Sequence, residues 1–432
     1  MVGMPPIPCP SGGKTGGKRG AAQKRRGGPS GQFGLLLSST LVASLTLVAT
    51  YAGVISVLLA NQVAAIDPAR KVANLAFVTS VAFAFTLFVP PIVGALSDRT
   101  RSRFGRRSPW MLGGAVVGAL LLIALGWASS LTWIVVLWTG AQMALNAFQA
   151  PFTAIVADRF PRSRRGIASA ASGFGVQVGA AVGVVIAGVL AERSESAYLA
   201  FAVAIAVVAV LFVTINRDHS SLGLRAEPFR FKSALSVFWV NPRAHPDFAW
   251  VFGARLLFTL GHYLVLAFQL FILIDYVGLP QSTANGVIGL LAVLSLCAAA
   301  PTILVAGWWS DRVRKRKPFI YFGSLIITLG LLIPILTPTV SGMIALSICN
   351  GVGYAIYDAS DSALMTEVLP ANGNRAGKDL GIFNLATNIP QAVAPVLGAA
   401  IIAWVGYEGV FALAAAAVLG AAVMLVPVKS VT

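Results

Sequence analysis

Twelve long apolar segments occupy most of the chain, and they constrain its fold more than any other feature of the sequence. Each carries almost no charge and has the length of about 20 residues that an α-helix needs to cross about 30 Å of hydrocarbon. Only helices and closed barrels satisfy every backbone polar group inside a bilayer. The segments cover residues 33 to 59, 72 to 95, 109 to 127, 131 to 154, 166 to 191, 197 to 215, 247 to 274, 283 to 306, 318 to 336, 340 to 366, 378 to 403 and 407 to 427. The sequence therefore predicts an all-α integral membrane protein with twelve transmembrane helices.

The composition agrees with this interpretation and excludes several classes of function. Charged residues make up 11% of the 432 residues, against about 25% in soluble domains. The three cysteines and three histidines are scattered, so they predict no disulfide framework, metal site or catalytic group. The segment SGGKTGGK near the N-terminus lacks the spacing of a nucleotide-binding loop. We expect no enzyme, no metal and no cofactor.

The positive charges fall almost entirely on one side of the predicted membrane. When the loops are assigned alternately to the two sides, 28 of the 32 Lys and Arg residues lie on the side of the termini. The positive-inside rule places that side in the cytoplasm. This orientation accounts for most of the net charge of +17, so no nucleic-acid partner is needed. Residues 1–32, which are basic and rich in Gly and Pro, are predicted to be a disordered tail.

Two internal repeats divide the chain into halves. The segment GALSDRTRSRFGRRSP at 94–109 is echoed by GWWSDRVRKRKP at 307–318, and VADRFP at 156–161 is echoed by MTEVLP at 365–370. Duplicated six-helix halves are one transporter pattern. We therefore expect two pseudo-symmetric six-helix bundles, residues 33–215 and 247–428, joined by a cytoplasmic linker, residues 216–246.

The repeated Gly-x-x-x-Asp-Arg loop resembles the signature loop of the major facilitator superfamily. Its expanded first copy is similar to the loop of sucrose/proton symporters, and ASDSALMTEVLP and GKDLGIFNLATNIPQAVAP resemble actinobacterial relatives placed beside the glycoside-cation symporters. The resemblance implies transport by alternating access. The second span has no acidic residue, whereas melibiose-type symporters carry paired aspartates there, so sodium coupling of that kind is not expected. Gly175, Gly179 and Gly183 are predicted to allow close helix packing.

Ionisable residues inside the apolar segments are costly and are therefore candidates for function. Arg255 and His262 lie in the seventh segment, and Asp358 and Asp361 lie in the tenth. At 1.5 Å rise per residue, Arg255 and Asp361 are each roughly 12 Å from the cytoplasmic surface. We predict that Arg255 pairs with Asp361 or Asp358 and that a carboxylate exchanges a proton for this partner. The alternative is a fixed ion pair that only joins two helices. His262 is either a second proton group or a packing residue.

Side-chain amides supply the candidate solute-binding groups, because they can hydrogen-bond a polyol. They lie in the fourth and eleventh segments and are Asn146, Gln149, Asn384, Asn388 and Gln391. Alternatively, each of them is an amide that packs between helices.

The family resemblance also implies a cytoplasmic gate. In this family the loop aspartate lies at the N-terminus of a helix in the other half, and a loop arginine pairs with the acid that ends the fourth span of its own half. The corresponding residues in this chain are Asp98, Arg99, Arg103, Arg106, Asp158, Asp311, Arg312 and Glu367. The alternative is that these loops serve only as topology signals.

These observations predict a secondary active transporter in the cytoplasmic membrane, monomeric in the lipid bilayer. Its expected partners are a small polar solute, a sugar or a glycoside, and a proton. A proton-coupled exporter of drug-like or metabolite molecules is the first alternative, and a membrane scaffold that transports nothing is the second.

Overall fold

The computed structural model describes residues 29–218, 220–222, 246–313, 316–368 and 376–428. Within these ranges the chain is helical and contains no strand, and twelve helices are long and apolar enough to cross a membrane. The predicted fold class is therefore confirmed.

The first half of the chain forms six spans. The first consists of α1 (Pro29–Gly53), the π-helical turn η1 (Val54–Leu58) and α2 (Leu59–Ile66), and the second of α3 (Lys71–Thr86) and α4 (Val89–Arg99). The remaining elements are α5 (Ser108–Gly126), α6 (Leu131–Arg159), η2 (Arg162–Arg164), α7 (Arg165–Val189), η3 (Ala191–Arg193) and α8 (Ser194–Ile215).

The second half repeats the arrangement with six further spans. The first of them consists of α10 (Pro246–Leu266), α11 (Gln269–Phe271) and the π-helical turn η5 (Ile272–Tyr276). It is followed by α12 (Gln281–Val313), α13 (Lys317–Leu336), α14 (Val340–Val368), α15 (Ala376–Trp404) and α16 (Tyr407–Met424).

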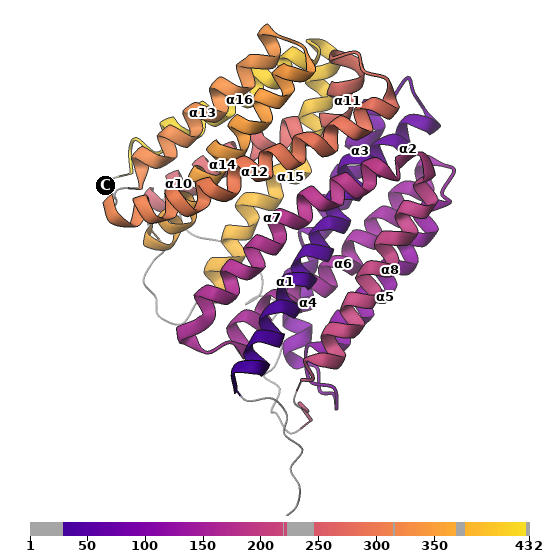
Figure 1. Cartoon of the computed structure of the whole chain (residues 1–432), viewed down its shortest axis with the longest axis vertical. Helices are drawn as coiled ribbons and strands as arrows, with labels where there is room; N and C mark the ends of the chain where they lie inside the picture. Colours follow the sequence, from indigo (N-terminus) through magenta and orange to yellow (C-terminus); the bar gives the residue numbers. More distant parts are fainter. Residues whose placement is uncertain (1–28, 219, 223–245, 314–315, 369–375, 429–432) are drawn as a thin grey trace, which may run out of the picture.

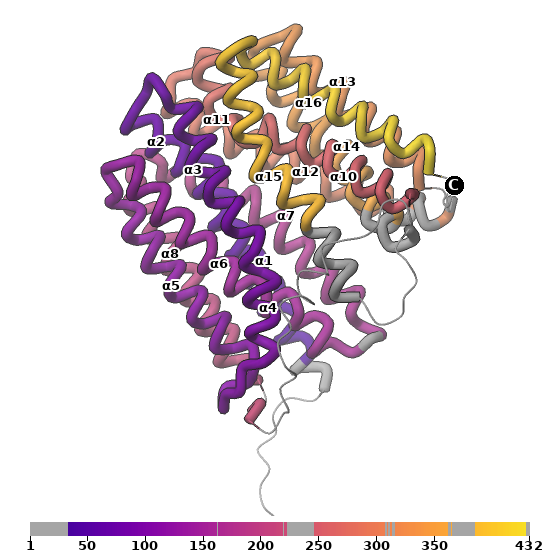
Figure 2. The backbone as a smooth tube through the Cα atoms, turned by 180° about the vertical axis from the view of Figure 1, so that it is seen from behind, coloured from indigo at the N-terminus to yellow at the C-terminus, as the bar shows by residue number. Residues whose placement is uncertain are grey.

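The two halves lie side by side as two helix bundles, with α1 to α8 in one and α10 to α16 in the other (Figure 1; Figure 2 shows the reverse side). Helix α3 of the first bundle packs against α15 of the second, and α7 packs against α12. Helices α2, α3 and α11 lie at one end of the molecule, whereas α1 begins at the other (Figure 1). Helices α2, α3 and α11 therefore mark one end of the molecule, opposite to the start of α1.

The first span is longer than the sequence predicted. Helix α1 begins at Pro29, within the predicted tail, but the membrane span runs from Phe33, as predicted, to Ile66 rather than to residue 59. The prediction stopped early because Asn61 and Gln62 interrupt the apolar run. In the structure both amides are satisfied inside the protein: Asn61 bonds to Asn285 at 2.8 Å, and Gln62 donates to the carbonyl of Leu125 at 2.8 Å. A buried polar group is tolerated in a helix when it is hydrogen-bonded.

Glycines bring α1 and α7 into close contact, as the sequence predicted. A Cβ atom at Gly175 would lie 2.6 Å from the carbonyl oxygen of Leu41, and one at Gly179 or Gly183 would also collide with the α1 backbone. Small residues of this kind allow transmembrane helices to approach closely, where van der Waals packing joins them.

Gly175→Val is therefore expected to destabilise the protein by about 1–3 kcal/mol, the usual cost of forcing extra methyl groups into a packed interface. A thermal melt of the detergent-purified protein should show a lower melting temperature. Gly173→Val is the matched control, since a Cβ at Gly173 meets nothing within 4 Å. Equal melting temperatures for the two variants would show that the α1–α7 contact does not need the glycine.

Candidate functional site

The predicted pair of charges inside the membrane spans is present. On α10, Nη1 of Arg255 donates to Oδ2 of Asp361 on α14, and Arg255 is 8% exposed while Asp361 is fully buried. Thr387 on α15 accepts hydrogen bonds from Nε and Nη2 of the same guanidinium, each at 3.4 Å. Arg255 thus joins three helices of the second half.

The site contains more negative than positive charge. Asp358 lies one helical turn before Asp361 on α14, is only partly buried, and acts electrostatically on Arg255. Oδ1 of Asp361 is buried and has no hydrogen-bond partner among the described residues. One guanidinium cannot neutralise two ionised carboxylates, and a proton bound to one of them would bring the group to zero net charge. The arrangement can therefore hold and release a proton.

The predicted solute-binding amides differ in their surroundings. Nδ2 of Asn146 donates to the hydroxyl of Tyr51 on α1 at 3.1 Å, and Nε2 of Gln391 donates to the hydroxyl of Tyr263 on α10 at 2.6 Å. Tyr51, Tyr263 and Thr387 were missed by the sequence reasoning, because single tyrosines and threonines carry no special signal in an apolar span.

The other predicted amides make fewer contacts. Gln149 and Asn388 are partly exposed and have no side-chain hydrogen bond to another described residue. The side chain of Asn384 lies outside the described residues. Among the four amides whose side chains are described, hydrogen bonds to other side chains are therefore seen only for Asn146 and Gln391.

His262 lies among aromatic rings rather than beside a carboxylate. Its ring centroid is 4.7 Å from that of Tyr354 and 5.4 Å from that of Tyr263, and Tyr354 is 6.0 Å from Phe258. These four rings come from α10 and α14 and form an aromatic cluster close to the charged pair.

The loop between α4 and α5 holds a compact set of charges. Nη2 of Arg106 and Nε of Arg107 bind the same oxygen of Asp158 at 2.8 Å and 2.7 Å, and both guanidinium groups also lie within 3.9 Å of Asp98. The predicted pairing of a loop arginine with the acid at the end of the fourth span is thus present in the first half, and Arg107 is an additional member.

The other predicted gate residues are distributed more widely. Arg99 donates to the carbonyl of Ala95 at 2.9 Å, and the guanidinium of Arg103 lies 4.9 Å from the ring of Phe104. Arg312 is exposed, and the side chains of Asp311 and Glu367 lie outside the described residues. Asp98 was expected at a helix of the other half. In the described part of the chain it contacts only the arginines of its own half.

At the opposite end of the molecule, the two halves are joined by an ion pair. Nζ of Lys71 lies 2.6 Å from Oδ1 of Asp275, and the hydroxyl of Tyr407 donates to the other oxygen of Asp275 at 2.7 Å. Lys71 opens α3, and Asp275 lies in η5, directly after α11. Helices α3 and α11 lie at the same end of the molecule in Figure 1. We call Lys71 and Asp275 together the Lys71–Asp275 pair.

A buried group of amides lies close to the same end. Nδ2 of Asn61 donates to Oδ1 of Asn285 at 2.8 Å, and Nε2 of Gln281 donates to Oδ1 of Asn61 at 2.7 Å. Asn61 is 7% and Asn285 is 6% exposed. The sequence reasoning missed both groups, because a contact between halves depends on how the bundles pack.

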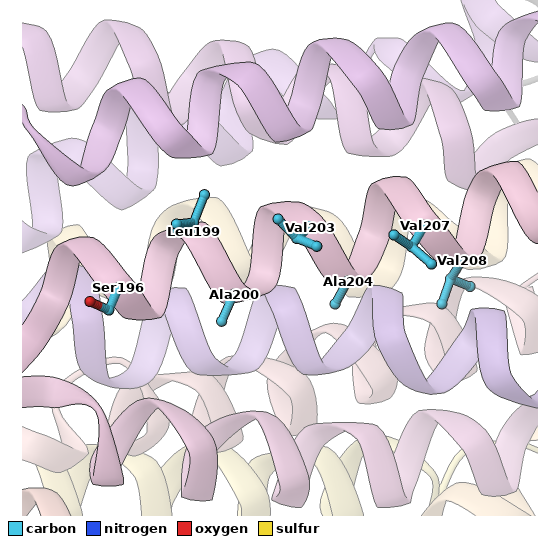
Figure 3. Close-up of a pocket in the computed structure, with 7 residues that line it drawn as sticks. All are labelled: Ser196, Leu199, Ala200, Val203, Ala204, Val207 and Val208. Atoms are coloured by element: carbon cyan, nitrogen blue, oxygen red, sulfur yellow. The ribbon is translucent and has the colours of Figure 1, made fainter.

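A shallow groove on the surface of α8 does not add to the site. It is lined by residues of this one helix: Ser196, Leu199, Ala200, Val203, Ala204, Val207 and Val208 (Figure 3). Its side chains are almost entirely apolar, and about half of the surface of Val203 is exposed. In a membrane-spanning helix such a face lies against lipid chains.

Comparison with known proteins gives a family match over most of the chain. The sequence profile described as Major Facilitator Superfamily matches residues 33–287 and 267–431. The multidrug resistance protein MdtG of Dickeya zeae is 25% identical over 354 residues, which cover 79% of this chain and 81% of that protein.

Two further relatives match only short segments. An uncharacterized symporter of Synechocystis, sll1374, is 68% identical over 34 residues, which are 8% of this chain and 6% of the symporter. The sucrose transport protein SUC4 of Arabidopsis thaliana is 43% identical over 47 residues, which are 11% of this chain and 9% of that protein. These matches cover only a small part of either relative.

Among solved structures, the nucleoside transporter NupG resembles this chain with a TM-score of 0.71 at 14% identity. The match covers 90% of this chain and 98% of NupG. At this identity the likeness extends to the fold.

Proposed function

The chain belongs to the major facilitator superfamily of membrane transporters, and from this premise we propose that it moves a small polar solute, a sugar or a glycoside, together with a proton. The proposed route is alternating access in the cytoplasmic membrane. Residues 33–215 and 247–428 are the two units that rock against each other, residues 216–246 are the linker, and a single copy is sufficient for transport.

The charged group of Arg255, Asp358 and Asp361 carries this proposal. A guanidinium held among apolar helices is costly unless it is paired, and here it faces two carboxylates. When a carboxylate binds a proton, its electrostatic attraction for Arg255 weakens. When the proton leaves, the ion pair forms again. This exchange gives the transporter two charge states, one for each direction of movement.

The solute class is supported by the polar groups of α6 and α15. Asn146 and Gln391 combine with tyrosine hydroxyls, which suits a ligand with several hydroxyl groups. The short match to a sucrose transport protein agrees with this choice.

The distribution of contacts supports an inward-facing form. With the termini in the cytoplasm, the Lys71–Asp275 pair and the amides around Asn61 are on the outer side. The hydrogen bonds and ion pairs seen between described residues of the two halves lie there. The loop arginines bind Asp158 within their own half, as expected when the inner gate is open.

Uptake measurements test the proposed function. The full-length protein is reconstituted into liposomes, and uptake of labelled sucrose, maltose, lactose, glucose and methyl glucoside is measured with and without an imposed pH gradient. We expect accumulation of at least one sugar that depends on the gradient. Empty liposomes provide the background, and absence of uptake for the whole panel would reject the sugar assignment.

A second candidate function is export of drug-like molecules. The match to a multidrug resistance protein over most of the chain and the aromatic cluster around Tyr354 and His262 favour it. Cells that express the protein are tested for efflux of a fluorescent cationic dye and for sugar uptake. The activity that is found separates the two candidates.

The Lys71–Asp275 pair gives a prediction about the outer gate. Asp275→Asn removes the charge that holds Lys71, so the outer side is expected to open more often. In a background with Cys9, Cys297 and Cys349 replaced by Ser, an added Asn285→Cys should react several-fold faster with a membrane-impermeant maleimide.

Glu408→Gln in the same background is the matched control, because Glu408 is an exposed acid next to Tyr407 at the same surface. Equal labelling rates for Asp275→Asn and Glu408→Gln would show that the Lys71–Asp275 pair does not hold the outer side closed.

A further inference from the structure

Two tyrosine–amide pairs lie at the middle of their membrane spans. Tyr51 is near the centre of the first span, Phe33–Ile66, and Asn146 is near the centre of α6. Tyr263 and Gln391 lie at the same level in the second half. Tyr263 is near the centre of the span that α10 and its continuation to Tyr276 form, and Gln391 is near the centre of α15, which runs from Ala376 to Trp404. Solute sites of transporters built from repeats lie near the bilayer midplane. The charged pair of Arg255 and Asp361 lies closer to the cytoplasmic ends of its helices.

The orientation of the Asn146 amide is fixed by the helix that carries it. Nδ2 of Asn146 donates both to the carbonyl of Gln142 at 2.9 Å and to the hydroxyl oxygen of Tyr51 at 3.1 Å. Only an amide nitrogen can donate to a carbonyl, so Oδ1 of Asn146 must point elsewhere. The tyrosine oxygen is occupied as an acceptor, so its O–H hydrogen also points away from the amide. The pair therefore presents one acceptor and one donor.

The second half contains the same chemical unit. Nε2 of Gln391 donates to the hydroxyl oxygen of Tyr263 at 2.6 Å, which leaves the amide oxygen and the tyrosine O–H hydrogen for another partner. Tyr51 and Tyr263 lie 212 positions apart in the sequence, close to the offset of 213 between Ser97 and Ser310 in the repeated loops. Each half thus contributes a tyrosine from the equivalent place in its first span.

Partial exposure distinguishes these tyrosines from packing residues. Tyr51, Asn146, Tyr263 and Gln391 are all partly exposed, although they lie at the middle of membrane spans. Among the described residues, neither tyrosine hydroxyl donates to a protein acceptor. By contrast, Tyr198 on α8 is fully buried and its hydroxyl donates to Oε1 of Gln62 at 2.8 Å.

We propose that the Tyr51–Asn146 and Tyr263–Gln391 pairs bind hydroxyl groups of the solute, one pair from each half, and select a neutral polyhydroxylated ligand. A hydroxyl donates one hydrogen bond and accepts another, so it matches the acceptor and donor of each pair. This inference rests on the proposed function and deepens it, because it names Tyr51 and Tyr263 as specificity-determining residues. Binding through both pairs also links the two halves while the solute is held.

The chemistry discriminates a hydroxyl from its isosteres. A fluorine or a methyl ether oxygen can accept from the tyrosine O–H but cannot donate to the amide oxygen. A site built to bind a hydroxyl leaves its own buried polar groups unpaired when the hydroxyl is replaced. Monofluoro and O-methyl derivatives should therefore compete poorly at the positions held by the pairs.

Tyr51→Phe and Tyr263→Phe test the proposal in reconstituted liposomes with the panel sugar that the wild type takes up best. Each variant keeps the ring and removes the hydroxyl, which is the proposed donor to the solute and the acceptor of the amide N–H. We expect each to raise KM by about 3- to 10-fold, the effect of losing one hydrogen bond to a neutral group, with a maximal rate close to that of the wild type. Tyr198→Phe is the matched control, because it also loses a tyrosine hydroxyl that is hydrogen-bonded to an amide, here Gln62, but near the start of α8. Its KM should stay unchanged.

The possible outcomes separate this proposal from the function on which it rests. A raised KM in both midplane variants, with the control unchanged and fluorinated competitors weakened, supports the proposal. Sugar uptake with wild-type KM in both variants would overturn the proposal alone. Failure of the wild type to take up any panel sugar would overturn the proposed function and this inference together.

Discussion

Asp361→Asn is expected to reduce proton-driven sugar uptake to the background of empty liposomes while solute exchange is partly retained. The asparagine oxygen can still accept a hydrogen bond from Arg255, so the contact between α10 and α14 survives. An amide, however, neither carries the negative charge nor binds the proton that exchanges for Arg255. Uptake under an imposed pH gradient and exchange without a gradient should be measured on the same preparation.

Asp67→Asn is a suitable control for Asp361→Asn. Asp67 lies in the loop between α2 and α3, where Oδ1 accepts from the backbone N–H of Arg70 at 3.1 Å, far from the charged group. It should leave gradient-driven uptake unchanged. Uptake at the wild-type level in Asp361→Asn would show that Asp361 only joins two helices.

Arg255→Ala is expected to have the largest effect on stability. It leaves Asp361 fully buried without its positive partner, and breaking a buried ion pair from one side costs about 3–5 kcal/mol. We expect a low yield of folded protein and a clearly lower melting temperature in detergent. The double variant Arg255→Ala with Asp361→Ala should regain much of the loss, because the fully buried carboxylate is removed together with its partner and only the partly buried Asp358 remains.

The double variant also separates the coupling role from a fixed ion pair. If the ion pair is only structural, the double variant, once folded, should still accumulate sugar against the sugar concentration gradient. The coupling role predicts that it folds and exchanges solute but does not respond to the pH gradient. If the single and the double variant have equally low melting temperatures, Arg255 is not the partner that compensates the buried charge of Asp361.

The fold followed from the sequence because its signal is strong and local. A run of apolar residues long enough to cross the bilayer has few alternatives to a helix. The repeated loops that begin at Gly94 and Gly307 indicate that the chain consists of two similar halves. Errors occurred at the ends of spans. The first span continues past residue 59 because Asn61 and Gln62 find partners on other helices, which the local sequence does not reveal.

The charged part of the site was predictable for a similar reason. Few charges occur inside the apolar segments, and equal depth restricted the partners of Arg255 to Asp361 and Asp358. Tyr51 and Tyr263 were missed because tyrosine is common in spans and is distinguished only by its partner. The Lys71–Asp275 pair was missed because it joins two bundles, and the local sequence does not show how the bundles pack.

Coupling of solute movement to a proton through Asp361 is tested most directly with a pH electrode. Liposomes that contain the protein are suspended in weakly buffered medium, and the panel sugar with the highest uptake is added. The wild type should make the medium more alkaline as sugar and protons enter together, and Asp361→Asn should give no such signal. Sugar uptake by the wild type without a pH change, or alkalinisation of equal size in Asp361→Asn, would contradict proton coupling at this residue.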